Sequence, residues 1–141
     1  MATHTRQPTI TYDTAAHAVA AAVRIGAEVG IRAVVCVVDP SMNLVAFARA
    51  DGATPHSVET SRRKADTAAS TRRPSASMRA DLVSALEHGS GGRLTSIAGG
   101  VPLIFDGLLV GGLGIAGGAP EQDIQVAELT LAEIGAEGAE S

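Results

Sequence analysis

The sequence predicts one α+β domain in which helices cover an antiparallel sheet. Two pairs of apolar, β-branched segments are each joined by a short turn, within residues 31–49 and 101–115. Strands joined by tight turns run antiparallel. Segments with apolar residues at three- and four-residue spacing flank these pairs, and this is the helical period. The 141 residues contain no long linker or repeat, so one domain is expected over residues 13–136.

The first third of the chain predicts a helix followed by a hairpin. After a polar arm at residues 1–12, Asp13 is the expected N-cap of a helix that ends at Gly30. Residues 31–38 form a nearly continuous β-branched run, which indicates a central strand buried on both faces. A polar turn then leads to a second strand at residues 44–49.

Two helices are expected between the hairpins. Thr54 followed by Pro55 is typical of an N-cap and a first helical position, so a helix is predicted from there to about Thr71. A third helix is predicted at residues 77–88, because a glycine-rich segment follows it.

The rest of the chain predicts a second hairpin and a last helix. Strands at residues 101–105 and 108–115 are joined by Asp106-Gly107, which is a strong hairpin signal. A helix at residues 120–134 follows, and the tail at 137–141 is expected to be frayed. An additional short strand is considered at residues 94–97.

Composition argues against several classes of function. Eleven basic residues face fifteen acidic ones and only three residues are aromatic, so a nucleic-acid partner is not expected. No apolar run approaches a membrane span and the N-terminal arm is too polar for a signal peptide, which predicts a cytoplasmic protein without a membrane partner. Cys36 lies in a valine-rich strand and is expected to be buried. Zinc-site, hydrolase and P-loop motifs are missing from the sequence, so a structural metal is not expected.

The helix predicted from Thr54 to Thr71 carries three stripes of side chains rather than the usual two. Its core stripe comprises Val58, Ala65, Ala69 and the aliphatic stem of Arg72. Its charged stripe, expected in solvent, comprises Glu59, Arg62, Arg63, Asp66 and Arg73. Between them lies a hydroxyl stripe of Ser57, Thr60, Ser61, Lys64, Thr67 and Thr71. Hydroxyls around the only lysine suit the wall of a pocket that binds an anionic group, or a contact between subunits. The third alternative is that the helix tolerates these Ser and Thr residues and they have no role in binding.

Two histidines have open roles. His17 lies beside the apolar face of the first helix, on one stripe with Arg24. It could ligate a metal or a haem iron, or it could remain a hydrogen-bonded surface residue. His56 is close in sequence to Arg49 and Asp51 and has the same alternatives.

Glycines are concentrated around the second hairpin. Gly112, Gly114 and Gly117 match the spacing GxGxxG, but a hairpin leaves no parallel strand for a dinucleotide-binding unit. Alternating glycines along a strand instead allow another backbone or a flat ligand to approach the sheet.

Five short motifs occur in an order that resembles the GlcG/HbpS family, which includes the C-terminal domain of the PduO cobalamin adenosyltransferase. They are Val37-Val38-Asp39, Arg49-Ala50-Asp51-Gly52-Ala53, Lys64-Ala65-Asp66-Thr67-Ala68, Gly99-Gly100-Val101-Pro102 and Gly117-Gly118-Ala119-Pro120-Glu121-Gln122-Asp123. The resemblance implies a profilin-like three-layer domain with a five-stranded antiparallel sheet between helices. It also implies homo-oligomers that bind small molecules, with haem or corrinoid ligands in some members.

The same resemblance implies a ligand site on this chain. The matching positions are Asp51, Gly52, Ala53, Lys64, Thr67, Gly99 and Gly100, with Arg49 beside them. A histidine of the first helix ligates haem in some relatives, and His17 lies in a comparable place. Family members often have an aromatic residue where this chain has Asp66. With three aromatic residues in total, the apolar clamp for a tetrapyrrole is thin, which leaves room for a smaller ligand.

The leading hypothesis is therefore a homo-oligomer that binds haem in preference to a corrinoid, with Lys64 pairing with a carboxylate and His17 meeting the iron. The alternative is an enzyme acting on a small carbonyl or carboxylate substrate. In that case Lys64 would be a base, an anchor or a Schiff-base amine, assisted by Asp51 or His56. A third interpretation is an assembly module whose hydroxyl stripe makes subunit contacts.

Overall fold

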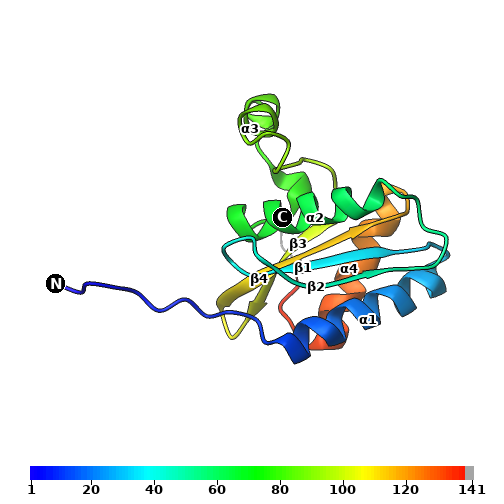
Figure 1. The fold of residues 1–141 in the computed structure, drawn as a ribbon, viewed down its shortest axis with the longest axis horizontal. Coiled ribbons are helices and arrows are strands. Elements are labelled where there is room, and N and C mark those ends of the chain that lie inside the picture. The colour runs from blue at the N-terminus through cyan, green and yellow to red at the C-terminus, as the bar shows by residue number, and fades with distance from the viewer. Residues whose placement is uncertain (139–141) are drawn as a thin grey trace.

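The architecture is a four-stranded antiparallel sheet between two layers of helices, seen in a computed structural model that describes residues 1–138 (Figure 1). The elements in chain order are α1 (Tyr12–Val29), β1 (Val34–Val38), β2 (Leu44–Arg49), α2 (Ser57–Thr71), the 3-10 helix η1 (Ser75–Ser77), α3 (Val83–Gly89), β3 (Gly100–Phe105), β4 (Leu108–Ala116) and α4 (Pro120–Ile134). The α+β class predicted from the two hairpins is confirmed.

The strand order is β2-β1-β4-β3, and every neighbouring pair is antiparallel. All five residues of β1 are buried, which agrees with its prediction as a central strand. Helices α1 and α4 pack together on one face of the sheet, and α2 covers the other face (Figure 1). Cys36 points to the α2 side, and burial raises the pKa of its thiol to about 12.

The prediction of a fifth strand is wrong, because residues 94–97 do not join the sheet. Side chains satisfy their backbone amides instead of a neighbouring strand. The Thr95 amide donates to Thr67 Oγ1 at 2.8 Å, and the Ser96 amide donates to the Glu87 carboxylate at 3.1 Å. This segment is a loop tied to α2 and α3.

Two helix starts differ from the prediction. Helix α1 begins at Tyr12, and its N-cap is Thr11 rather than Asp13, because the Thr11 hydroxyl accepts the Thr14 amide at 3.2 Å. Helix α2 begins at Ser57 rather than at Pro55, because the preceding residues form a turn. In this turn the Ser57 amide donates to the Thr54 carbonyl, three residues earlier, rather than to one four residues earlier as in an α-helix. Gly30 ends α1 in the left-handed conformation, as predicted.

The single helix predicted at residues 77–88 is replaced by η1 and α3. Helix α3 stands away from the body of the molecule and has no buried residue (Figure 1). Leu82 and Leu86 are consequently 39% and 37% exposed.

The chain after α4 remains in contact with the sheet up to Glu137. The Glu137 amide donates to the Ile104 carbonyl at 2.9 Å, so the chain is still held to β3 at that point. Residues 139–141 of the predicted tail lie outside the described part of the chain.

Within residues 1–138 no helix is long and apolar enough to cross a bilayer. The cytoplasmic location stays a prediction.

Glycines on the sheet face that α2 covers bring this helix unusually close. A Cβ atom added to Gly100, Gly112 or Gly114 would overlap the α2 carbonyl oxygens of Lys64, Ala65 and Ser61 respectively. The alternating glycines were expected to admit either another backbone or a flat ligand to the sheet. In the structure the backbone of α2 occupies this position. The contact fixes both the height and the register of α2 above the sheet.

Replacing Gly114 by Ala should lower the free energy of unfolding by at least about 2 kcal/mol, because the new methyl group meets backbone that cannot rotate away. Urea unfolding followed by circular dichroism measures the change. Gly89→Ala is the matched control, since an added Cβ there has no atom within 4 Å. Equal stability of Gly114→Ala and the control would contradict the close packing.

Candidate functional site

The only lysine of the chain is buried at one end of the sheet. Lys64 of α2 is 1% exposed, and its Nζ donates to the Ile115 carbonyl at 2.8 Å and to Asp123 Oδ2 at 2.9 Å. Asp123, in the first turn of α4, also accepts the Gly118 amide at 2.9 Å. A Cβ atom at Gly99 would lie 3.0 Å from this amine, so the glycine leaves room for it.

Burial and pairing act on this ion pair in opposite directions. Burial lowers the pKa of Lys64, and the charge of Asp123 opposes the shift. Burial raises the pKa of Asp123, and Lys64 opposes that shift. Each group therefore depends on the other to stay charged, so the pair is a structural tie between α2 and α4.

A cleft of about 410 Å³ opens beside this pair. A second cleft, of about 440 Å³, adjoins it and shares three of its lining residues, Thr54, Gly117 and Gly118. Together the clefts bring the predicted site residues Gly52, Ala53, His56 and Lys64 to one end of the sheet, with Ser57 and Thr60 of the hydroxyl stripe. The cleft walls thus combine the loop before α2, the hydroxyl stripe and the turn between β4 and α4.

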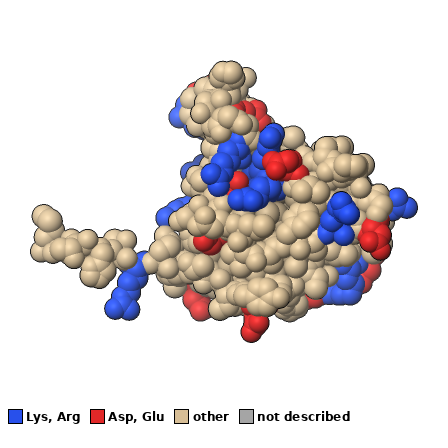
Figure 2. Space-filling model, viewed as in Figure 1, with Lys and Arg blue, Asp and Glu red and all other residues tan. Residues whose placement is uncertain are grey.

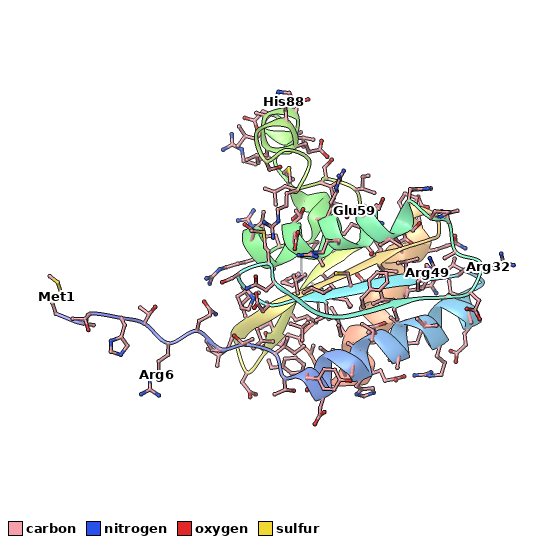
Figure 3. The ribbon with its side chains drawn as sticks, viewed as in Figure 1. Met1, Arg6, Arg32, Arg49, Glu59 and His88 are labelled. Atoms are coloured by element: carbon pink, nitrogen blue, oxygen red, sulfur yellow. The ribbon has the colours of Figure 1, made fainter. Side chains whose placement is uncertain are left out.

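Other predicted site residues lie elsewhere. Gly99 and Gly100 line a separate cleft of about 270 Å³ beside η1. Thr67 is buried, and its hydroxyl accepts the Thr95 amide and so holds the loop after α3. Arg49 and Asp51 are exposed, and Arg49 lies near Arg32 at the end of the sheet (Figure 3).

His17 does not share the cleft with Lys64. Its side chain is 56% exposed, and its Nε2 lies 3.6 Å from Glu133 Oε2 near the end of α4. Arg24 also pairs with Glu133, and its hydrogen bond lowers the pKa of that carboxyl. Glu133 lies ten positions after Asp123 in α4, which corresponds to about 15 Å of helix.

Asp66 corrects the prediction of a charged stripe in solvent. It is 2% exposed and pairs with Arg62 and Arg93. Burial raises the pKa of Asp66, and hydrogen bonding to Arg93 opposes the shift. Arg93 comes 27 residues after Asp66, and Asp123 comes 59 residues after Lys64, so neither pairing leaves a local pattern in the sequence. Among residues 1–138, no cluster of three His, Cys, Asp or Glu side chains could hold a metal ion.

Breaking the buried pair from either side should destabilise the protein by about 3–5 kcal/mol, with opposite pH dependence. In Lys64→Met, Asp123 is left unpaired with a raised pKa, so the native state binds a proton more readily than the unfolded chain. The loss of stability should therefore grow as pH rises above the ordinary aspartate range.

In Asp123→Asn, Lys64 is left unpaired with a lowered pKa, so the native state releases a proton more readily than the unfolded chain. Its loss of stability should shrink as pH rises toward the ordinary lysine pKa. Urea unfolding of wild type and both variants between pH 5 and pH 9 measures the trends. Parallel pH profiles for the two variants would rule out a coupled buried pair.

The family model described as "Haem degrading protein HbpS-like" matches residues 10–132. The corrinoid adenosyltransferase PduO of Citrobacter freundii is 47% identical over 49 residues. That match spans 35% of this chain and only 15% of the length of PduO.

Two solved structures share the fold over nearly the whole chain. A crystal structure described as a PduOC:heme complex has a TM-score of 0.86 and 28% identity, and the match covers 94% of this chain and 99% of that one. A double mutant of HbpS from Streptomyces reticuli has a TM-score of 0.82 and 32% identity, with 92% and 90% of the two chains covered. Because the family model and the fold both extend over most of the sequence, the chain belongs to the HbpS-like family.

Proposed function

We propose that the protein binds haem or a related tetrapyrrole, with His17 of α1 as a ligand of the iron. The observation that carries this proposal is the likeness over nearly the whole chain to PduOC, a structure described as a complex with haem. Histidine is a common axial ligand of haem iron. When bound, haem supplies an iron centre whose reactivity depends on its axial ligand and on the polarity around it.

The surroundings of His17 suit a flat macrocycle. The imidazole is exposed, and Ala20, three residues further along the helix, is exposed and too small to obstruct a ring. Leu129 is 45% exposed and lies one helical turn before Glu133, the residue that contacts His17, so it offers apolar contact area. Arg24 could pair with a propionate in place of Glu133, because both side chains are partly in solvent.

The proposed haem site has protein on one side only, because His17 lies on an exposed face formed by α1 and α4. A macrocycle on that face would leave its other side in water, and burial of that side would favour binding. We propose that a second copy of the chain covers it, so that the protein works as a homo-oligomer.

The alternative of a Schiff-base enzyme receives less support from the geometry. The Lys64 amine would have to leave both Asp123 and the Ile115 carbonyl before it could attack a carbonyl carbon. The cleft beside it remains suited to a small polar ligand held by hydroxyls.

Haem titration tests the proposed iron ligand. Wild-type protein should give a saturable Soret shift, and His17→Ala should weaken the affinity by at least about tenfold because the iron loses a ligand. His56→Ala, at the Lys64 cleft, is the matched control and should behave as wild type. A loss confined to His56→Ala would place the haem in that cleft instead, and no shift with wild type would exclude haem.

Assembly can be measured separately by light scattering. The wild-type mass should be a multiple of the 14.2 kDa chain mass. Leu129→Glu should move the protein toward the monomer, because it places a charge on the face around His17. Leu108→Glu, at a position 53% exposed beside the β3–β4 turn, serves as control and should leave the mass unchanged. A wild-type monomer would contradict the proposed assembly.

A further inference from the structure

Three arginines converge on a cleft that is separate from both the Lys64 cleft and the face around His17. Its volume is about 240 Å³, and it is lined by Glu59, Arg62, Arg63, Asp66, Gly91 and Arg93. Figure 2 shows basic side chains gathered on this face, between the protruding α3 segment and the body of the molecule. We propose that this arginine cleft binds a phosphate group, either as the free anion or as the end of a phosphorylated small molecule.

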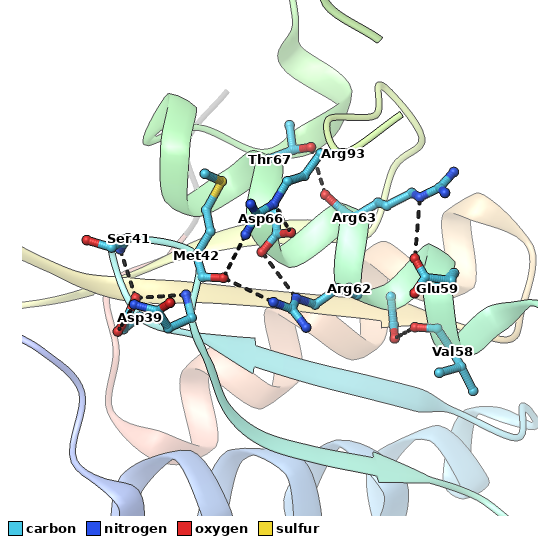
Figure 4. Close-up of polar contacts among 12 residues, drawn as sticks. Asp39, Ser41, Met42, Val58, Glu59, Arg62, Arg63, Asp66, Thr67 and Arg93 are labelled. Atoms are coloured by element: carbon cyan, nitrogen blue, oxygen red, sulfur yellow. Dashed lines mark hydrogen bonds and ion pairs between the residues drawn. The ribbon is translucent and has the colours of Figure 1, made fainter. Parts of the chain in front are cut away.

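The protein holds two of the guanidinium groups in place (Figure 4). Nε of Arg62 and Nε of Arg93 donate to opposite oxygens of Asp66, at 3.5 and 3.1 Å. The Nη2 of each arginine donates to the Met42 carbonyl, at 3.1 Å in both cases. A guanidinium carries five N–H donors, so each arginine keeps about three for a ligand. Asp66 is buried, so it anchors both groups without occupying the cleft mouth.

Three segments distant in sequence supply these anchors. Met42 adopts a left-handed conformation with φ of 65° at the tip of the first hairpin, where the Asp39 carboxylate accepts the Ser41 and Asn43 amides. Arg93 comes from the loop after α3, which is tied to α2 through Thr95. The two arginines are therefore ordered before a ligand arrives, which reduces the entropy lost on binding.

Arg63 supplies a third guanidinium that is less constrained. Its Nε lies 3.6 Å from Glu59, whose side chain is 71% exposed. An exposed pair of this kind is weak, so an incoming anion can displace Glu59 at little cost. The cleft lining holds three arginines against two carboxylates, Asp66 and Glu59, so one positive charge is in excess, and a second becomes available when Glu59 is displaced. The excess positive charge and the planar donor groups match the charge and the several oxygens of phosphate.

Calorimetric titration in low-salt buffer tests the site with two probes, inorganic phosphate and glycerol phosphate. Wild-type protein should bind at least one of them saturably. Arg63→Gln should weaken that binding by about tenfold or more, because it removes a charged donor without touching Asp66. Arg6→Gln removes the same charge from the N-terminal arm, far from the cleft, and should change nothing (Figure 3).

The outcomes separate the sources of the phosphate. Binding of inorganic phosphate alone supports the free anion, and binding of glycerol phosphate supports a phosphorylated small molecule. Absence of saturable binding in wild type would overturn the proposal, as would equal affinities of wild type and Arg63→Gln or an equal loss in Arg6→Gln. Haem titration of Arg63→Gln, run in parallel, should match wild type, so this site and the proposed haem site can fail independently.

Discussion

The close contact between α2 and the glycine-bearing strands is the constraint on which the rest of the structure depends. Side chains of ordinary size at Gly100, Gly112 and Gly114 would lift α2 away from the sheet. At its present height, α2 can extend Lys64 past the end of β4 to Asp123 and can place Asp66 within reach of two arginines. The polar groups of this helix are therefore buried because its backbone is close to the sheet, and each buried charge has a partner.

Helix α4 contributes residues to both candidate sites, one near each of its ends. Its first turn carries Asp123, which holds Lys64 beside the cleft at the end of the sheet. Its last turns carry Glu133, which contacts His17 and Arg24 on an open face. A tetrapyrrole on the open face and a small polar molecule in the cleft would therefore not compete for the same residues.

Local signals in the sequence were sufficient for most of the fold. The Asp106-Gly107 turn, the buried run of β1 and the left-handed Gly30 all depend on a few neighbouring residues, and each is found where it was predicted. The strand considered at residues 94–97 is wrong because two of their amides donate to the Thr67 hydroxyl and the Glu87 carboxylate instead of to a neighbouring strand. Contacts of this kind leave no periodic pattern in the chain.

The site was predictable to a smaller extent for the same reason. The motifs correctly pointed to the family. Lys64 and the loop before α2, which the same motifs assign to a ligand, line two adjoining clefts, and their role in binding stays a prediction. Asp66 was expected in solvent, but it is buried and pairs with two arginines. The Thr67 hydroxyl accepts the Thr95 amide, a contact that the helical stripe did not indicate. The separation of His17 from Lys64 depends on how α1 and α4 pack, which a stripe on one helix does not specify.

Whether this member of the HbpS-like family carries a tetrapyrrole, as proposed, can be measured by native mass spectrometry of the protein purified from haem-supplied cells. The expected result is an assembly of several chains with bound haem, together with a Soret band in the same sample. Chains that carry no tetrapyrrole, and that still show no Soret band after haem is added, would contradict it.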